Sequence, residues 1–278
     1  MKLHIIETGF FKLDGGAMFG VVPKSIWNKL NPADENNMCT WALRSILIED
    51  EGRRILVDTG MGNKQDEKFF GHYYLHGDAR LESSLNKAGF QKEDITDVIH
   101  THLHFDHCGG AIERINEELI PTFPNAIYWS NERHWKWATE PNDREKASFL
   151  KENILPMKES GRLSMIDVKE PLSRFTENIS IRFAYGHTDA MMLPQITMGG
   201  KTFVFMADLL PSAAHIPIPY VMAYDMFPLT SLHEKKAFLE EAVANDYILI
   251  FQHDPNIIGC TLHRTEKGIR MNEVYPFT

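Results

Sequence analysis

Cysteine is scarce in this chain of 278 residues. The three that are present, Cys39, Cys108 and Cys260, are odd in number, lie far apart and form no C-x-x-C pair. A disulfide framework would need paired cysteines, and a cysteine zinc knuckle would need closely spaced ones. Neither kind of stabilisation is therefore indicated.

Long apolar runs are also missing. The longest, such as 220–224 and 247–251, are far shorter than the roughly 20 residues that a membrane-spanning helix needs. The first residues, MKLHIIETGFF, interrupt their apolar stretch with His4 and Glu7, so they lack the core and cleavage site of a secretory signal. We therefore expect a cytoplasmic protein with no membrane partner.

The chain has no excess of positive charge, no internal repeat and no low-complexity linker. It has 29 basic and 38 acidic residues, which gives a formal charge of −9. Because this negative charge repels polyanions, nucleic acid is not an expected partner. With 43% apolar residues it can bury a large core. We expect one domain over residues 1–278.

Local patterns predict strands and helices in alternating groups. The expected strands span residues 3–11, 18–22, 45–48, 54–57, 97–101, 164–168, 179–184, 193–198, 202–206 and 247–251, with a hairpin over 264–274. The expected helices span residues 79–88, 142–155 and 231–244. Strands in two groups, each followed by helices, indicate an α/β protein whose sheets are covered by helices, but periodicity alone does not name the fold.

The strongest chemical signal is the segment THLHFDHCGG over residues 101–110. His102 and His104 alternate at the end of an apolar strand and are expected to point the same way, while Asp106 and His107 follow in a turn. A lone histidine is usually an ordinary packed residue. Imidazole and carboxylate groups, however, suit zinc, iron, cobalt or manganese, and four of them exceed what one ion with an open position needs. The segment predicts two metal ions.

This segment resembles the H-x-H-x-D-H signature of the metallo-β-lactamase superfamily, in which a distant His, Asp and His follow. His187, Asp208 and His253 each come just after an apolar strand, in that order. The resemblance implies an αββα fold of two mixed sheets flanked by helices. It also implies that one ion is bound by His102, His104 and His187, the other by Asp106, His107 and His253, and that Asp208 bridges them.

Further residues refine the resemblance. Asp208 stands where exported β-lactamases of the superfamily usually carry Cys, so an antibiotic-resistance enzyme is disfavoured. Asp58 matches a D-T-G element whose carboxylate orients a ligand histidine, although a plain turn residue is the alternative. Residues 14–24 and 221–225 resemble the YtnP-type branch, close to N-acyl-homoserine lactonases, and the same element occurs in relatives that hydrolyse organophosphates or esters.

Several roles stay open. Asp106 or Asp208 could move the proton during catalysis, and the candidates for a hydrogen bond to the substrate are His215, Tyr220 and Tyr224, each of which could equally be an ordinary packed residue. The aromatic loop 61–77 could form the wall of an acyl pocket, or it could pack on the core or on a partner subunit. The residues expected to pack on helices or to play a structural part are His100, Trp129, His134, Trp135 and Trp137.

The function expected from the resemblance is hydrolysis of a lactone ring by a dinuclear centre, most simply with Zn²⁺, while Co²⁺, Mn²⁺ or Fe²⁺ are alternatives. Aryl esters, phosphotriesters or thioesters are alternative substrates, and a metal-binding protein without turnover is an alternative of another class. A small-molecule lactone or ester is the expected partner, and relatives in this branch are often homodimers.

Overall fold

The structure is a computed structural model that describes residues 1–277 as two compact units. Unit 1 comprises Met1–Gly9 and Leu43–Phe175, and unit 2 comprises Phe10–Ala42 and the chain from Thr176 onward. The chain passes between the units within strands β1 (Lys2–Asp14) and β2 (Met38–Asp50). The expectation of one domain over 1–278 stays a prediction, and its last residue lies outside the described part.

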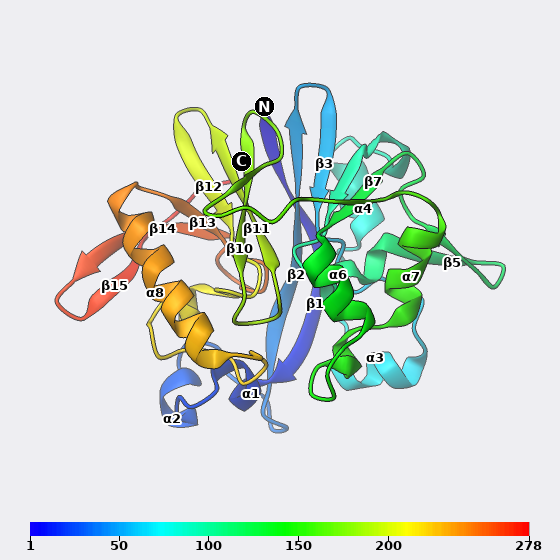
Figure 1. Cartoon of the computed structure of the whole chain (residues 1–278). Coiled ribbons are helices and arrows are strands. Elements are labelled where there is room, and N and C mark those ends of the chain that lie inside the picture. Colours follow the sequence, from blue (N-terminus) through cyan, green and yellow to red (C-terminus); the bar gives the residue numbers. More distant parts are fainter. Residues whose placement is uncertain (278) are drawn as a thin grey trace. The chain divides into compact units, whose positions relative to one another are not determined.

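Unit 1 is built on a six-stranded sheet in the order β1-β2-β3-β4-β7-β8 (Figure 1). Its further strands are β3 (Arg53–Val57), β4 (Asp97–Ile99), β7 (Ile127–Ser130) and β8 (Leu163–Met165), and β5 (Ile112–Ile115) and β6 (Glu118–Pro121) form a separate hairpin. Its helices are α3 (Glu67–Tyr73), α4 (Leu81–Lys87), α5 (Phe105–Cys108), α6 (Glu132–Thr139) and α7 (Lys151–Glu159), with 3₁₀ turns at Lys92–Asp94, Gly109–Ala111 and Lys146–Ser148.

The central strands of unit 1 run parallel, and this register places the functional segment. Val57 of β3 pairs with Ile99 of β4, and Ile99 pairs with Trp129 of β7. Buried apolar side chains such as Leu56 and Val98 join these strands to the helices in one core. The residues that follow β3 and β4 therefore leave the sheet at the same edge.

Unit 2 carries a seven-stranded sheet in the order β15-β14-β13-β12-β11-β10-β9. The strands are β9 (Ser173–Arg174), β10 (Ile179–Ala184), β11 (Met191–Met198), β12 (Lys201–Phe205), β13 (Ile248–Ile250), β14 (Gly259–Thr265) and β15 (Gly268–Val274). The helices are α1 (Gly15–Phe19), α2 (Lys24–Trp27) and α8 (Pro228–Ala244), with a 3₁₀ turn at Ala213–His215. Helix α8 lies along this sheet (Figure 1), and its Phe238 and Leu239 pack into the unit's core.

Most expected elements of unit 2 are confirmed, but the strand expected over 18–22 is wrong. The structure forms helix α1 there because the Asp14 carboxylate accepts a hydrogen bond from the backbone N–H of Ala17 at 2.8 Å and caps the first turn. Gly15 is required at this point, because a Cβ there would lie 2.4 Å from the Trp27 ring. The apolar run of 18–22 therefore packs as a helical turn and its exit.

In unit 1 the expected helix 142–155 is wrong in its bounds, since α7 begins only at Lys151. Asn142 starts a tight turn instead, because its side-chain oxygen accepts from the backbone N–H groups of Arg144 and Glu145. The strand expected over 97–101 ends at Ile99, so His102 and His104 lie in a loop rather than on a strand. Asp106 and His107, expected in a turn, lie in helix α5, and Trp129 lies in strand β7.

None of the helices described for residues 1–277 is both long and apolar enough to cross a membrane.

Candidate metal centre

The metal-competent side chains of unit 1 follow the parallel strands β3 and β4. Asp58 comes directly after β3, and its backbone N–H still donates to the carbonyl of Ile99 at 2.9 Å. The segment after β4 then carries His102 and His104 before α5 begins. Because β3 and β4 pair in parallel and end at the same side of the sheet, the D-T-G element lies beside the H-x-H-x-D-H segment.

Asp58 is completely buried and has a left-handed backbone with φ of 58°, a strained conformation for a non-glycine residue. Its carboxylate accepts from the backbone N–H and the hydroxyl of Thr101, both at 2.7 Å, and from Nδ1 of His107 at 3.0 Å. Because the Thr101 hydroxyl donates its only proton to Asp58, it accepts from Nδ1 of His102 at 3.1 Å. The Nε2 atoms of His102 and His107 are therefore left unprotonated in neutral rings.

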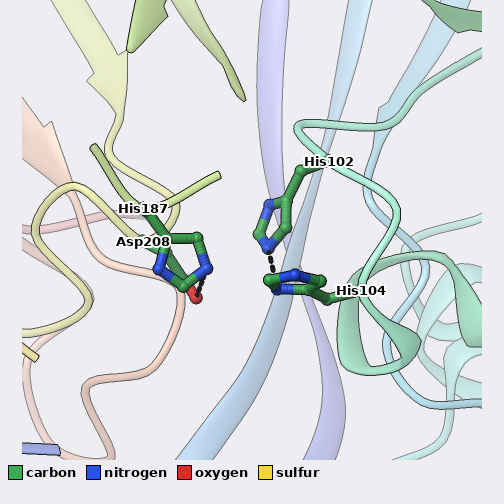
Figure 2. Close-up of side chains that lie close together, drawn as sticks. All are labelled: His102, His104, His187 and Asp208. Atoms are coloured by element: carbon green, nitrogen blue, oxygen red, sulfur yellow. Dashed lines mark hydrogen bonds and ion pairs between the residues drawn. The ribbon is translucent and has the colours of Figure 1, made fainter. Parts of the chain in front are cut away.

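His104 is oriented by a carboxylate that lies far along the chain. Its Nε2 donates to Glu145 Oε1 at 2.9 Å, and Glu145 is buried. The other ring nitrogen, Nδ1, lies 3.0 Å from Nε2 of His102 (Figure 2). Asp106 completes the group of unit 1, with an oxygen 3.6 Å from Nε2 of His107.

Unit 2 presents His187, Asp208 and His253. Asp208 and His253 follow the parallel strands β12 and β13, in which Phe205 pairs with Ile250. One oxygen of Asp208 lies 3.1 Å from Nε2 of His187 (Figure 2), and the other lies 3.1 Å from Nε2 of His253. Each carboxylate oxygen thus faces a different imidazole.

The outer nitrogens of these two histidines are also held. Nδ1 of His187 lies 2.9 Å from an oxygen of Asp225, and Nδ1 of His253 donates to the carbonyl of Ala42 at 2.8 Å. Burial alone would lower the pKa of His187, but the negative charges of Asp208 and Asp225 raise it to about 10.

These contacts fit a bound cation. A neutral His253 that donates through Nδ1 presents an unprotonated Nε2 to the Asp208 oxygen, so two electron-pair donors face each other at 3.1 Å. His102 and His104 face each other in the same way at 3.0 Å. Facing electron-pair donors with their outer nitrogens fixed by carboxylates or carbonyls are typical of metal ligands.

The three candidates for contact with the substrate differ in their surroundings. His215 is buried with both ring nitrogens engaged, by the Ser212 hydroxyl at 2.7 Å and the Met18 carbonyl at 2.9 Å, and burial lowers its pKa to about 3. Its ring also stacks on Phe19. Tyr224 is 38% exposed, and Tyr220 meets the Phe19 ring edge-on. His215 is thus tied into the fold, whereas Tyr224 reaches solvent.

The aromatic loop lies against the metal-competent segment. Phe69 and Tyr73 of α3 pack on Phe105, with ring centroids 5.2 and 4.6 Å apart, and Phe105 stands between His104 and Asp106 in the sequence. Burial, and less strongly the charge of Asp106, raises the pKa of Tyr73 to about 12, so its hydroxyl stays protonated. Phe70 contacts Phe69.

The histidines and tryptophans expected to have structural roles fall into two groups. His100 is buried and stacks near Tyr128, and Trp135 packs in the core of unit 1. Trp129 donates its indole N–H to Asp97. Two neighbours in this region, His134 and Trp137, instead contact the ligand segment or its carboxylate partner.

Sequence reasoning missed three residues that hold the candidate ligand histidines. Asp225 lies within the 221–225 motif, to which the resemblance assigns no histidine partner, and Thr101 lies within the signature itself. Glu145 has no motif around it. Glu145 is 41 residues from His104, and only the folded chain brings the two together.

Comparison with known families now decides the chain's membership, because the family model of the metallo-β-lactamase superfamily matches residues 44–258. The chain belongs to this superfamily. The matched range contains the seven residues that resemble the superfamily signature. The α/β fold class and the metallo-β-lactamase fold expected from the sequence are confirmed.

The chain is also similar to proteins named as lactonases. The chain is 31% identical over 129 residues to N-acyl homoserine lactonase AiiA of Bacillus thuringiensis subsp. kurstaki, and 30% identical to the N-acyl homoserine lactonase of a Bacillus species. Each alignment covers 43% of this chain and 47% of the relative, so the matched part spans about half the length of these curated relatives.

Two solved structures match almost the whole chain. A probable metal-dependent hydrolase from Staphylococcus aureus has a TM-score of 0.87 at 28% identity and covers 99% of this chain and 98% of its own. AidC, a dizinc quorum-quenching lactonase, has a TM-score of 0.81 at 21% identity and covers 99% of this chain and 95% of its own. At 21% identity the likeness to AidC supports the fold alone.

Proposed function

We propose that this protein is a metal-dependent hydrolase that holds two divalent metal ions. His102, His104 and His187 bind one ion, Asp106, His107 and His253 bind the other, and Asp208 bridges them. The observation that carries the proposal is that four of the histidines are each held by an oxygen at the ring nitrogen that would point away from the metal. The four holding groups are Asp58, Glu145, Asp225 and the Ala42 carbonyl. Zinc is the ion we expect, because imidazole and carboxylate ligands suit it.

The proposed substrate is the lactone ring of an N-acyl-homoserine lactone. The curated relatives carry that activity in their names, which supports this choice. Phe69, Tyr73 and Phe105 form an aromatic cluster next to the ligand segment, where it can contact an acyl chain. The soluble small-molecule substrate requires no membrane or nucleic-acid partner, and a homodimer is compatible with this function.

The chain's own residues supply positioning and proton transfer. Two bound divalent ions would lower the pKa of water to about 7 and polarise the ester carbonyl. Asp208, which faces imidazoles with both oxygens, keeps its two ligand histidines in a fixed relation. Asp106 is largely buried beside His107, with 12% of its side chain exposed. Either carboxylate can accept the proton of the attacking water and return it to the leaving alkoxide.

Tyr224 is the proposed hydrogen-bond donor to the substrate, because it is the more exposed of the tyrosines considered. His215 keeps the segment after Asp208 in place through its contacts with Ser212 and Met18. We therefore assign His215 a positioning role within the candidate catalytic set.

A substrate panel on protein of known metal content tests the proposal. The panel contains homoserine lactones of several chain lengths, a γ-lactone, paraoxon, p-nitrophenyl acetate and a thioester. The proposal expects two ions per chain and the highest kcat/KM for a homoserine lactone. A different best substrate would overturn the lactonase assignment alone, and metal-loaded protein without any turnover would favour a metal-binding protein.

A further inference from the structure

The segment from Asn131 to Glu145 packs against the first two ligand histidines of unit 1 without providing a ligand of its own. It contains α6, whose first turn is capped when Asn131 Oδ1 accepts from the backbone N–H of His134 at 2.8 Å. The ring of His134 is fully buried, and its Nε2 accepts from the backbone N–H of Leu103 at 2.9 Å. His134 therefore fixes the peptide that lies between His102 and His104.

Glu145, at the end of the same segment, fixes a ring rather than a peptide. Its Oε1 accepts from Nε2 of His104 at 2.9 Å, while its Oε2 accepts from the indole N–H of Trp137 at 2.6 Å and from the Asn142 amide at 3.3 Å. Glu145 is 2% exposed, so its negative charge is withheld from water and its acceptor positions are directed at named donors.

This arrangement has a chemical consequence for His104. A carboxylate that only accepts must receive a proton from Nε2, which leaves Nδ1 as the electron-pair donor. Nδ1 is the nitrogen that lies 3.0 Å from Nε2 of His102. The charge of Glu145 also makes the imidazole a stronger donor, as the acidic partners of metal-bound histidines do.

We propose that Glu145 is a positioning residue that sets the tautomer and the donor strength of His104. Trp137 holds the Glu145 carboxylate, and His134 holds the peptide of Leu103, so that Glu145 and His104 stay in contact. This inference rests on the proposed dinuclear site. It assigns Glu145 to the ion bound by His102, His104 and His187, whereas Asp58 acts on the other ion through His107.

The test is metal affinity, measured for each ion by titration with Co²⁺ followed by visible absorption and by metal content in chelator-buffered solutions. The wild-type protein is measured first. Wild-type protein that binds fewer than two ions overturns the proposed function itself, and this result is separate from any failure of the present inference.

The informative variant is Glu145→Gln, which preserves size but replaces one acceptor oxygen by an N–H donor. The amide then cannot accept from both His104 and Trp137. We expect the affinity for one ion to fall by about 10–100-fold, with the second ion retained. An affinity for both ions within threefold of the wild type would overturn the inference.

Asp97→Asn is the matched control. Asp97 is also buried and accepts from the indole N–H of Trp129 at 2.8 Å. Its other partners are Arg53 and Thr96, and neither is a proposed ligand. Asp97→Asn should leave both metal affinities unchanged even where it lowers the melting temperature. Equal losses in the two variants would show that metal release follows general loosening, which contradicts a specific role for Glu145.

Trp137→Phe provides a second route if Glu145→Gln does not fold. It keeps the carboxylate on His104 and removes the donor to Oε2. A weaker loss of affinity for the same ion supports the inference, whereas unchanged affinity for both ions counts against a role for Trp137 and Glu145 in positioning His104.

Discussion

Phe69→Ala tests whether the aromatic cluster Phe69, Tyr73 and Phe105 contacts the acyl chain of the substrate. Phe69 is the residue to remove, because its ring meets both Phe105 and Tyr73, at 5.2 and 5.0 Å between centroids, while Phe70 meets Phe69 at 5.6 Å. Phe105 lies between His104 and Asp106, two of the proposed ligands, so an acyl chain that is attached through its amide to a lactone ring held at the metals can reach Phe69.

The magnitude follows from the apolar area that the cluster can cover. A buried methylene is worth about 0.8 kcal/mol, which is roughly fourfold in kcat/KM. A decanoyl chain has four more methylenes than a hexanoyl chain, so full burial would favour it by about 3 kcal/mol. If three rings share this contact equally, Phe69→Ala removes about 1 kcal/mol of the preference, or roughly fivefold.

The assay is kcat/KM for butanoyl, hexanoyl, octanoyl and decanoyl homoserine lactones at fixed metal content. Phe69→Ala should reduce the dependence on chain length, and Phe69→Leu should largely restore it because an apolar side chain remains. Tyr74→Ala, which changes a half-exposed aromatic residue at the end of the same helix, serves as control. Equal losses at every chain length in Phe69→Ala would refute the assignment of this cluster to the acyl chain.

Three further predictions follow from side-chain contacts within each unit. Asp208→Ala should lower turnover by orders of magnitude and reduce the metal content, since both oxygens face imidazoles; near-normal rates would contradict the bridging role. Asp58→Asn should lower metal affinity or activity about 10–100-fold, and full metal content at full rate would leave Asp58 a turn residue only. Burial would raise the pKa of Asp97, but hydrogen bonds from Arg53, Thr96 and Trp129 lower it, so its stabilising effect should be present above about pH 4 and disappear at lower pH. The difference in free energy of unfolding between wild type and Asp97→Asn, measured in urea from pH 6 to pH 2, should therefore shrink toward low pH, and a constant difference would exclude this account.

The sequence alone indicates the residues that we propose as ligands, because each follows an apolar strand or lies in one short motif. Asp208 and His253 follow β12 and β13, and the parallel pairing of these strands brings the two residues together without any further information. The prediction that His102 and His104 alternate along a strand was wrong, because β4 ends at Ile99. The backbone N–H of Thr101 donates to the Asp58 carboxylate instead of to a neighbouring strand. A hydrogen bond from a backbone N–H to a distant side chain, such as that from Thr101 to Asp58, cannot be predicted from the spacing of apolar residues.

The elements that were wrong share a physical cause. Residues 18–22 have the composition of a strand, yet Asp14 caps a helical turn that begins at Gly15 and includes residues 18 and 19. Asn142 likewise delays the helix that is expected from residue 142. Capping side chains outweigh weak local propensity when the segment is only one or two turns long.

The positioning partners are harder to predict than the ligands, because they are selected by distance in the fold. Glu145 lies between α6 and α7, and its acidic side chain resembles that of any surface glutamate until its burial and its contact with His104 are known. A histidine ligand has few alternatives in its motif, whereas any carboxylate that reaches the ring can serve as its partner.

His253 is held differently from the other ligand histidines, and the difference has consequences for substitution. Its Nδ1 donates to the Ala42 carbonyl, and the backbone N–H of Ala42 donates in return to the His253 carbonyl at 3.0 Å. Both bonds use main-chain atoms of β2, so replacing the Ala42 side chain removes neither of them. His104, His107 and His187 rely on carboxylate side chains that a single substitution can remove. Because a neutral carbonyl also strengthens an imidazole less than a carboxylate does, His253 should be the weakest of these donors and should depend most on Asp208, whose oxygen faces its Nε2.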